Sequence, residues 1–141
     1  MKVFFQKNNQ GDSDFFQTIA DTCEGLIYVS EIDAPVLPFA SQPNDTSSEE
    51  NILHDAAISG DAMIEERNFE DFFARLTAIK DWFGDREIAR AKKFLELKTL
   101  LEENLRDLKV FRKGSIRIEI FAVGIDKSGR LMGVTTKAVE T

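Results

Sequence analysis

The side chains that could carry out acid–base or nucleophilic chemistry are few in this sequence. His54 is the only histidine and Cys23 the only cysteine. A nucleophile needs a neighbouring base and commonly a glycine-flanked turn, and the sequence provides no such turn. We therefore expect Cys23 to be a small buried residue on a helix face and His54 to be a surface or loop residue. A single cysteine also excludes an internal disulfide and a multi-cysteine zinc site.

Adjacent carboxylates are the other candidates, because paired acids can bind a metal or act as acid and base. Three pairs occur, at Glu49 and Glu50, Glu65 and Glu66, and Glu102 and Glu103. Neighbours on a helix point about a quarter-turn apart, so we interpret these pairs as solvated surface. The eight glycines are scattered singly and form no phosphate-binding loop. The sequence therefore predicts a protein that is not an enzyme and has no cofactor and no metal site.

Charge is distributed unevenly along the chain. Residues 1–71 hold 15 acids and 3 bases, residues 72–141 hold 10 acids and 15 bases, and the net charge is −7. Nucleic acid binding relies on lysine and arginine replacing condensed counterions, so direct binding to DNA or RNA is disfavoured. A basic protein partner is favoured instead.

The length of 141 residues suffices for one domain with a hydrophobic core, so we expect a single domain over 1–141. No apolar run approaches the length of a membrane span, and the first residues lack the apolar stretch of a secretory signal. We expect a cytoplasmic protein that acts as a monomer and does not bind membranes.

The first element expected to position functional residues is a helix that begins after Ser13. Its apolar residues recur at helical spacing up to Cys23, and Gly25 is expected to end it. Residues 26–29 predict a short buried strand, which leaves the core over 30–33. The prolines and small polar residues of 35–48 indicate a long surface loop. Residues 49–68 are ambiguous: 52–58 could be helical, and 62–64 could form a strand.

Two further helices and a hairpin are expected after this segment. Asn68 is a plausible N-cap for a helix with Phe69, Phe72, Phe73 and Leu76 on its inner side. A connector over 77–84 contains Trp82, and a long amphipathic helix then runs from Asp85 to near Asp107. Its predicted apolar face is formed by Ile88, Ala91, Leu95, Leu101, Leu105 and Leu108.

The last third of the sequence changes to the period of two that is typical of a sheet. Ile116, Ile118 and Ile120 alternate with Arg117 and Glu119, and residues 126–129 are turn formers. Residues 130–139 can return as the antiparallel partner. The order of elements predicts an α+β domain, with helices covering a mostly antiparallel sheet that ends in a C-terminal β-hairpin.

Three blocks of the sequence resemble the nuclease A inhibitor family of bacteria. The first block is residues 21–31, which contain the pattern Glu-Gly-Leu-Ile-Tyr-Val-Ser-Glu. The second is residues 69–83, which contain Phe-Phe and then Asp-Trp. The third is residues 129–141, which are very similar to the C-terminal end of the family's sequences. The chain also stops where the family's chains stop. The resemblance implies that the fold is an α/β/α sandwich. It also implies that the protein inhibits a magnesium-dependent nuclease, one that cleaves both DNA and RNA, by binding to it one-to-one.

The same resemblance implies which residues contact the nuclease. Glu31, Trp82 and Thr141 match contact positions of the family, and Lys80 stands where a family member has a glutamine that also contacts the enzyme. A carboxylate at Glu31 can imitate a phosphate toward arginine, and Thr141 offers hard oxygen donors to the nuclease-bound magnesium. Trp82 provides a large aromatic anchor.

Two other classes of function stay open on the residues alone. An acidic interaction module with a different partner would spread binding over the acids of residues 45–71. A hydrolase using carboxylates and a metal would show turnover and bind Mg²⁺ or Mn²⁺ without a partner.

Overall fold

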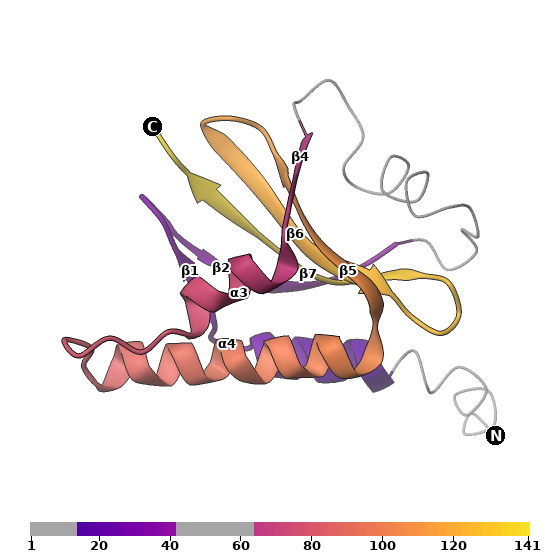
Figure 1. Ribbon diagram of the computed structural model, residues 1–141, viewed down its shortest axis with the longest axis horizontal. Coiled ribbons are helices and arrows are strands. Elements are labelled where there is room, and N and C mark those ends of the chain that lie inside the picture. The colour runs from indigo at the N-terminus through magenta and orange to yellow at the C-terminus, as the bar shows by residue number, and fades with distance from the viewer. Residues whose placement is uncertain (1–13, 42–63) are drawn as a thin grey trace.

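A computed structural model describes residues 14–41 and 64–141 of the chain (Figure 1). Several expectations fall outside these residues and stay untested: the positions of His54 and of Glu49 and Glu50, the possible helix over 52–58, and the loop beyond Ser41. Of the possible strand over 62–64, only Ile64 is described, and it begins strand β4.

A five-stranded antiparallel sheet forms the centre of the fold, with the strand order β3-β7-β6-β5-β4. Its strands are β3 (Leu37–Ala40), β4 (Ile64–Arg67), β5 (Arg106–Lys113), β6 (Arg117–Ile125) and β7 (Leu131–Val139). A separate two-stranded hairpin contains β1 (Ile27–Val29) and β2 (Asp33–Pro35). The predicted C-terminal hairpin is confirmed, because β6 and β7 pair from Arg117 with Val139 to Ile125 with Leu131.

In the described part of the chain, three helices lie on one face of the sheet (Figure 1). They are a helix over residues 14–23, α3 (Phe69–Thr77) and α4 (Asp85–Asn104). Their apolar sides and the facing sheet residues form one buried cluster, which includes Ile19, Phe73, Leu97 and Ile120. A second cluster on the opposite face contains Phe121 and Leu131 with partly buried Phe39. The α+β class is therefore confirmed, and the described residues show one of the two helical layers of the expected sandwich.

The helix boundaries follow the capping residues in the sequence. Asn68 caps α3 as predicted, because its Oδ1 accepts a hydrogen bond from the Asp71 amide at 2.9 Å. The Glu87 side chain accepts the amide of Gly84 at 3.0 Å and closes the start of α4. Gly25 follows the first helix with a φ of 75°, a left-handed conformation that glycine adopts readily.

The long helix begins at Asp85 as predicted, but its predicted end near Asp107 was wrong. The helix ends at Asn104, and residues 106–113 form the interior strand β5. Leu105 and Leu108 therefore lie beyond the helix, and Leu95 is 51% exposed. The buried helix residues are Ala91, Phe94, Leu97 and Leu101. The arginine, leucine and lysine residues of β5 are also good helix formers, and pairing with β4 and β6 determines their strand conformation.

The loop predicted from residue 35 onward was also wrong in its first part. Residues 33–35 and 37–40 are strands, and Pro38 lies within β3. Proline lacks an amide donor but is tolerated in an edge strand, where one side of the backbone needs no partner. β3 is such an edge strand and pairs only with β7 within the sheet.

Cys23 is buried on the inner side of the first helix, as predicted. Burial raises the pKa of its thiol to about 11, which Lys93 opposes only in part. We expect the native protein to react with a thiol-specific reagent at about pH 8 roughly 100-fold more slowly than the unfolded chain. Absorbance of the released thiolate, with the guanidinium-unfolded protein as control, measures both rates. Equal rates in the two states would show that the thiol is accessible.

No helix among the described residues is long and apolar enough to cross a membrane.

Candidate functional site

The turn between β1 and β2 lies against the end of β7. The Ser30 amide donates to the Ile32 carbonyl at 2.8 Å and closes this turn. Its hydroxyl oxygen accepts the Val139 amide at 3.1 Å, and the Glu31 amide donates to the Val139 carbonyl at 3.4 Å. The turn is thus fixed to β7 although 109 residues separate Ser30 from Val139.

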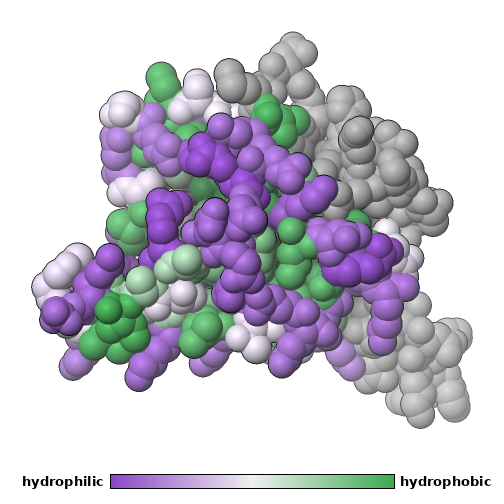
Figure 2. Space-filling model, viewed as in Figure 1, coloured by the Kyte–Doolittle hydropathy of each residue, from purple (hydrophilic) through white to green (hydrophobic). Residues whose placement is uncertain are grey.

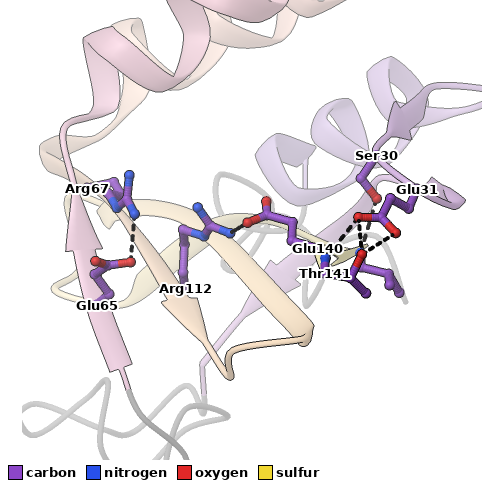
Figure 3. A network of polar contacts seen from close by, with 8 residues as sticks. Ser30, Glu31, Glu65, Arg67, Arg112, Glu140 and Thr141 are labelled. Carbon is purple, nitrogen blue, oxygen red and sulfur yellow. Dashed lines mark hydrogen bonds and ion pairs between the residues drawn. The ribbon is translucent and has the colours of Figure 1, made fainter.

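The structure brings Glu31 and Thr141 together, two of the four predicted site residues (Figure 3). The Thr141 amide donates to Glu31 Oε2 at 2.8 Å. The Thr141 hydroxyl lies 3.0 Å from Oε1 and 3.1 Å from Oε2 of the same carboxylate. Both residues are exposed, so one charged acceptor on the surface holds two donors of Thr141.

Glu140, the residue before Thr141, contacts β5 and the residue before β6. Its carboxylate forms an ion pair with Arg112 of β5 at 2.6 Å, and its amide donates to the Ile116 carbonyl at 3.0 Å. Figure 3 shows this pair beside the contacts between Glu31 and Thr141. Chain ends are commonly loose, whereas here each residue from Val139 to Thr141 has a side-chain partner.

Trp82 and Lys80 lie in the connector between α3 and α4. Trp82 is 76% exposed, and its ring meets that of Phe83 edge-on at a centroid distance of 4.8 Å. The Phe83 amide donates to the Lys80 carbonyl at 3.0 Å, which makes the connector a tight turn. Within the described part of the chain, no hydrogen bond or ion pair joins this connector to Glu31 or Thr141. The connector, the β1–β2 turn and the chain end nevertheless point to the same side of the molecule (Figure 1).

Exposed apolar residues accompany both parts of the site. Val29 and Ile32 flank Glu31, and Ile116, which is 57% exposed, precedes β6 and accepts the amide of Glu140. Figure 2 shows a green, hydrophobic patch at the lower left, where the connector lies in Figure 1. Ile79 and Trp82 of the connector are exposed, at 53% and 76%. Sequence reasoning missed Val29 and Ile116 as surface residues, because apolar residues in or beside a strand normally indicate core. Ile32 lies where the strand was expected to leave the core, and it is 41% exposed.

The carboxylate pairs that the structure describes are exposed, as predicted. Glu65 pairs with Arg67 at 2.8 Å, and Glu102 pairs with Lys98 at 3.4 Å. Lys98 also binds Glu70 at 3.1 Å and so links α4 to α3. The hydrogen bond that Lys98 donates to Glu70 and the negative charge of Glu102 raise the pKa of Lys98. In residues 14–41 and 64–141, no three His, Cys, Asp or Glu side chains gather where they could hold a metal ion.

Comparison with known proteins gives one family. No curated protein matches the sequence significantly. The model of the nuclease A inhibitor-like protein family matches residues 13–141, which is nearly the whole chain and contains Glu31, Lys80, Trp82 and Thr141. The chain therefore belongs to the nuclease A inhibitor-like family.

Proposed function

We propose that this protein inhibits a sugar-nonspecific, magnesium-dependent nuclease by binding one-to-one over its active site. Family membership supports a nuclease as the partner. The observation that carries the proposal is the contact between Glu31 and Thr141, which fixes a carboxylate and a hydroxyl together at the molecular surface. Such a rigid oxygen-rich projection suits a cleft built to hold phosphate beside Mg²⁺ and arginine.

The two residues have complementary roles in this proposal. The Thr141 hydroxyl directs its proton to Glu31, so its lone pairs are free to replace a water on the magnesium ion of the nuclease. Each carboxylate oxygen of Glu31 can accept more than one hydrogen bond, so Glu31 can also receive an arginine of the nuclease. Glu31 is then both a contact and the residue that orients Thr141.

Trp82 is the proposed aromatic anchor of the interface. Its exposure leaves most of the ring free for a partner, and buried aromatic residues dominate the energy of many interfaces. Lys80 occupies the same connector and brings a positive charge where a family member has glutamine. We propose that Lys80 meets an acidic or carbonyl group of the nuclease and influences which nuclease is bound.

The acidic surface fits a basic partner. At a net charge of −7, attraction to the cationic cleft of a nuclease speeds encounter, and repulsion from DNA and RNA keeps the inhibitor from binding the substrate.

A plasmid-digestion assay tests the proposal. A magnesium-dependent, sugar-nonspecific nuclease is titrated with the protein while Mg²⁺ stays in large excess. We expect cleavage to stop near one equivalent, since each monomer carries one site formed by Glu31 and Thr141. Excess metal excludes chelation as the cause. Unchanged cleavage at a large molar excess of inhibitor would contradict the proposal for that nuclease.

An acidic interaction module on the same fold is the alternative function. It would place binding on many carboxylates, so neutralising exposed acids such as Asp71 or Glu66 would weaken binding more than changing Thr141. Alanine scanning against the partner protein that the chain captures distinguishes the two. A hydrolase would instead show turnover of nucleic acid with Mg²⁺ or Mn²⁺ alone, which the same digestion assay without nuclease measures.

A further inference from the structure

A cavity of about 290 Å³ opens between α3, the sheet and the hairpin strand β1. Its charged lining comes from three arginines and two acids, Arg67, Arg75, Arg112, Asp71 and Glu140. Tyr28, Asn68, Phe72 and Ile120 complete the wall. We call it the arginine cavity. Its lining carries one more positive than negative charge, and Glu65, which lies outside the lining, pairs with Arg67 at 2.8 Å.

Sheet register and helix periodicity bring the arginines together. Arg67 lies two residues from Glu65, which is paired with Arg112 in the β4–β5 ladder, so both arginines extend from the same face of the sheet. Figure 3 shows them on neighbouring strands, with Glu140 against Arg112. On α3, Asn68, Asp71, Phe72 and Arg75 follow a helical spacing of three and four residues and present one side to the cavity.

Tyr28 gives an independent indication of a ligand. The residue is only 7% exposed, and its ring stacks on Phe72 at 6.0 Å with an interplanar angle of 12°. Its hydroxyl has no hydrogen-bond partner in the described part of the chain. The only fully enclosed, unpaired side-chain oxygen or nitrogen among the described residues is Asp126 Oδ2, so the Tyr28 hydroxyl keeps some exposed surface, and Tyr28 lines the arginine cavity. Buried tyrosines normally find a polar partner.

The arginines differ in how much of their donor capacity is used. Arg67 pairs with Glu65 and Arg112 with Glu140, whereas Arg75 is exposed and has no ion pair within the described residues. A carboxylate would satisfy one guanidinium. A phosphate monoester carries nearly two negative charges and three acceptor oxygens, enough for Arg75, Arg112 and Tyr28 together.

We propose that the arginine cavity binds the phosphate group of a phosphate monoester, held by Arg75, Arg112 and the hydroxyl of Tyr28. The volume leaves room for an organic group beside the phosphate. Because Arg112 also holds Glu140, a bound phosphate competes for the ion pair next to Thr141. A ligand here would therefore loosen the chain end and weaken nuclease inhibition. That consequence rests on the proposed function, whereas phosphate binding does not.

Titration of the free full-length protein tests the site without a nuclease, so its failure and that of the proposed function are distinguishable. The probes are inorganic phosphate and adenosine 5′-monophosphate, and adenosine is the control. The heat of binding of each probe is measured by titration calorimetry at low ionic strength. We expect one saturable site for at least one phosphate probe and none for adenosine. Tighter binding of the nucleotide than of phosphate would show that the organic group contributes.

Three variants locate the site. Arg75→Gln should weaken binding of the phosphate probe about tenfold, and Tyr28→Phe should weaken it by a smaller factor while keeping the stacking on Phe72. Arg117→Gln removes the same charge from the opposite face of the sheet and should leave binding unchanged. The proposal is overturned by no saturable binding of either phosphate probe, by equal binding of adenosine, or by equal losses in Arg75→Gln and Arg117→Gln.

Discussion

Glu31→Ala is expected to weaken nuclease inhibition about 100-fold while leaving the fold intact. The substitution removes the acceptor of both the amide and the hydroxyl of Thr141 and the carboxylate offered to the nuclease. Losing one partner of a charged hydrogen-bonded contact in an interface costs roughly 2–5 kcal/mol. Because Glu31 is exposed in the free protein, the cost falls on binding and not on folding. Inhibition titrations and thermal unfolding curves measure the two effects separately.

Matched variants separate orientation from contact. Thr141→Val removes the hydroxyl at similar size, and Thr141→Ser retains it, so only the first should weaken inhibition strongly. If Glu31 acts partly by orienting Thr141, the double variant Glu31→Ala/Thr141→Val loses less than the sum of the single losses. Glu66→Ala is the control for charge, as it removes an exposed acid from β4. Inhibition by Glu31→Ala equal to that of Glu66→Ala would remove Glu31 from the contact surface.

The helices and the C-terminal hairpin were predictable because their signals are local. Asn68 caps α3, the phenylalanines after it recur at helical spacing, and the turn before β7 follows from residues 126–129. β5 was not predictable in the same way, because its residues suit a helix and its strand conformation depends on neighbours far away in sequence. A bulge between Arg106 and Lys109, with Asp107 at a φ of 53°, further interrupts any period of two.

The residues of the candidate site could be predicted only from the family resemblance. Glu31 and Thr141 are 110 residues apart, and nothing local to either residue indicates that they meet. Their contact depends on the Ser30 hydroxyl joining the β1–β2 turn to β7. The ion pair of Arg112 with Glu140 and the arginine cavity both depend on β5 being a strand. Because this strand was not predicted, neither feature could be predicted.

Trp82→Ala should weaken inhibition by a similar factor through a different physical cause. The ring is 76% exposed, and packing it against a nuclease would remove a large apolar area from water. Truncated aromatic anchors typically cost about 2–4 kcal/mol of binding energy, which corresponds to roughly 30- to 1,000-fold. Folding stability should change little, because Trp82 is already 76% exposed in the free protein. Dissociation rates from an immobilised nuclease, together with thermal unfolding, measure both quantities.

Trp82→Phe and Leu95→Ala make this prediction specific. Phenylalanine keeps an aromatic ring and should recover part of the affinity, whereas Leu95, exposed on α4, tests for a general effect of removing surface apolar area. The connector and the chain end lie on the same side of the molecule (Figure 1), and no hydrogen bond or ion pair within the described residues joins them. The losses from Trp82→Ala and Thr141→Val should therefore add in the double variant, in contrast to those from Glu31→Ala and Thr141→Val. Strong coupling between Trp82 and Thr141 would instead require the nuclease to link them through one shared rearrangement.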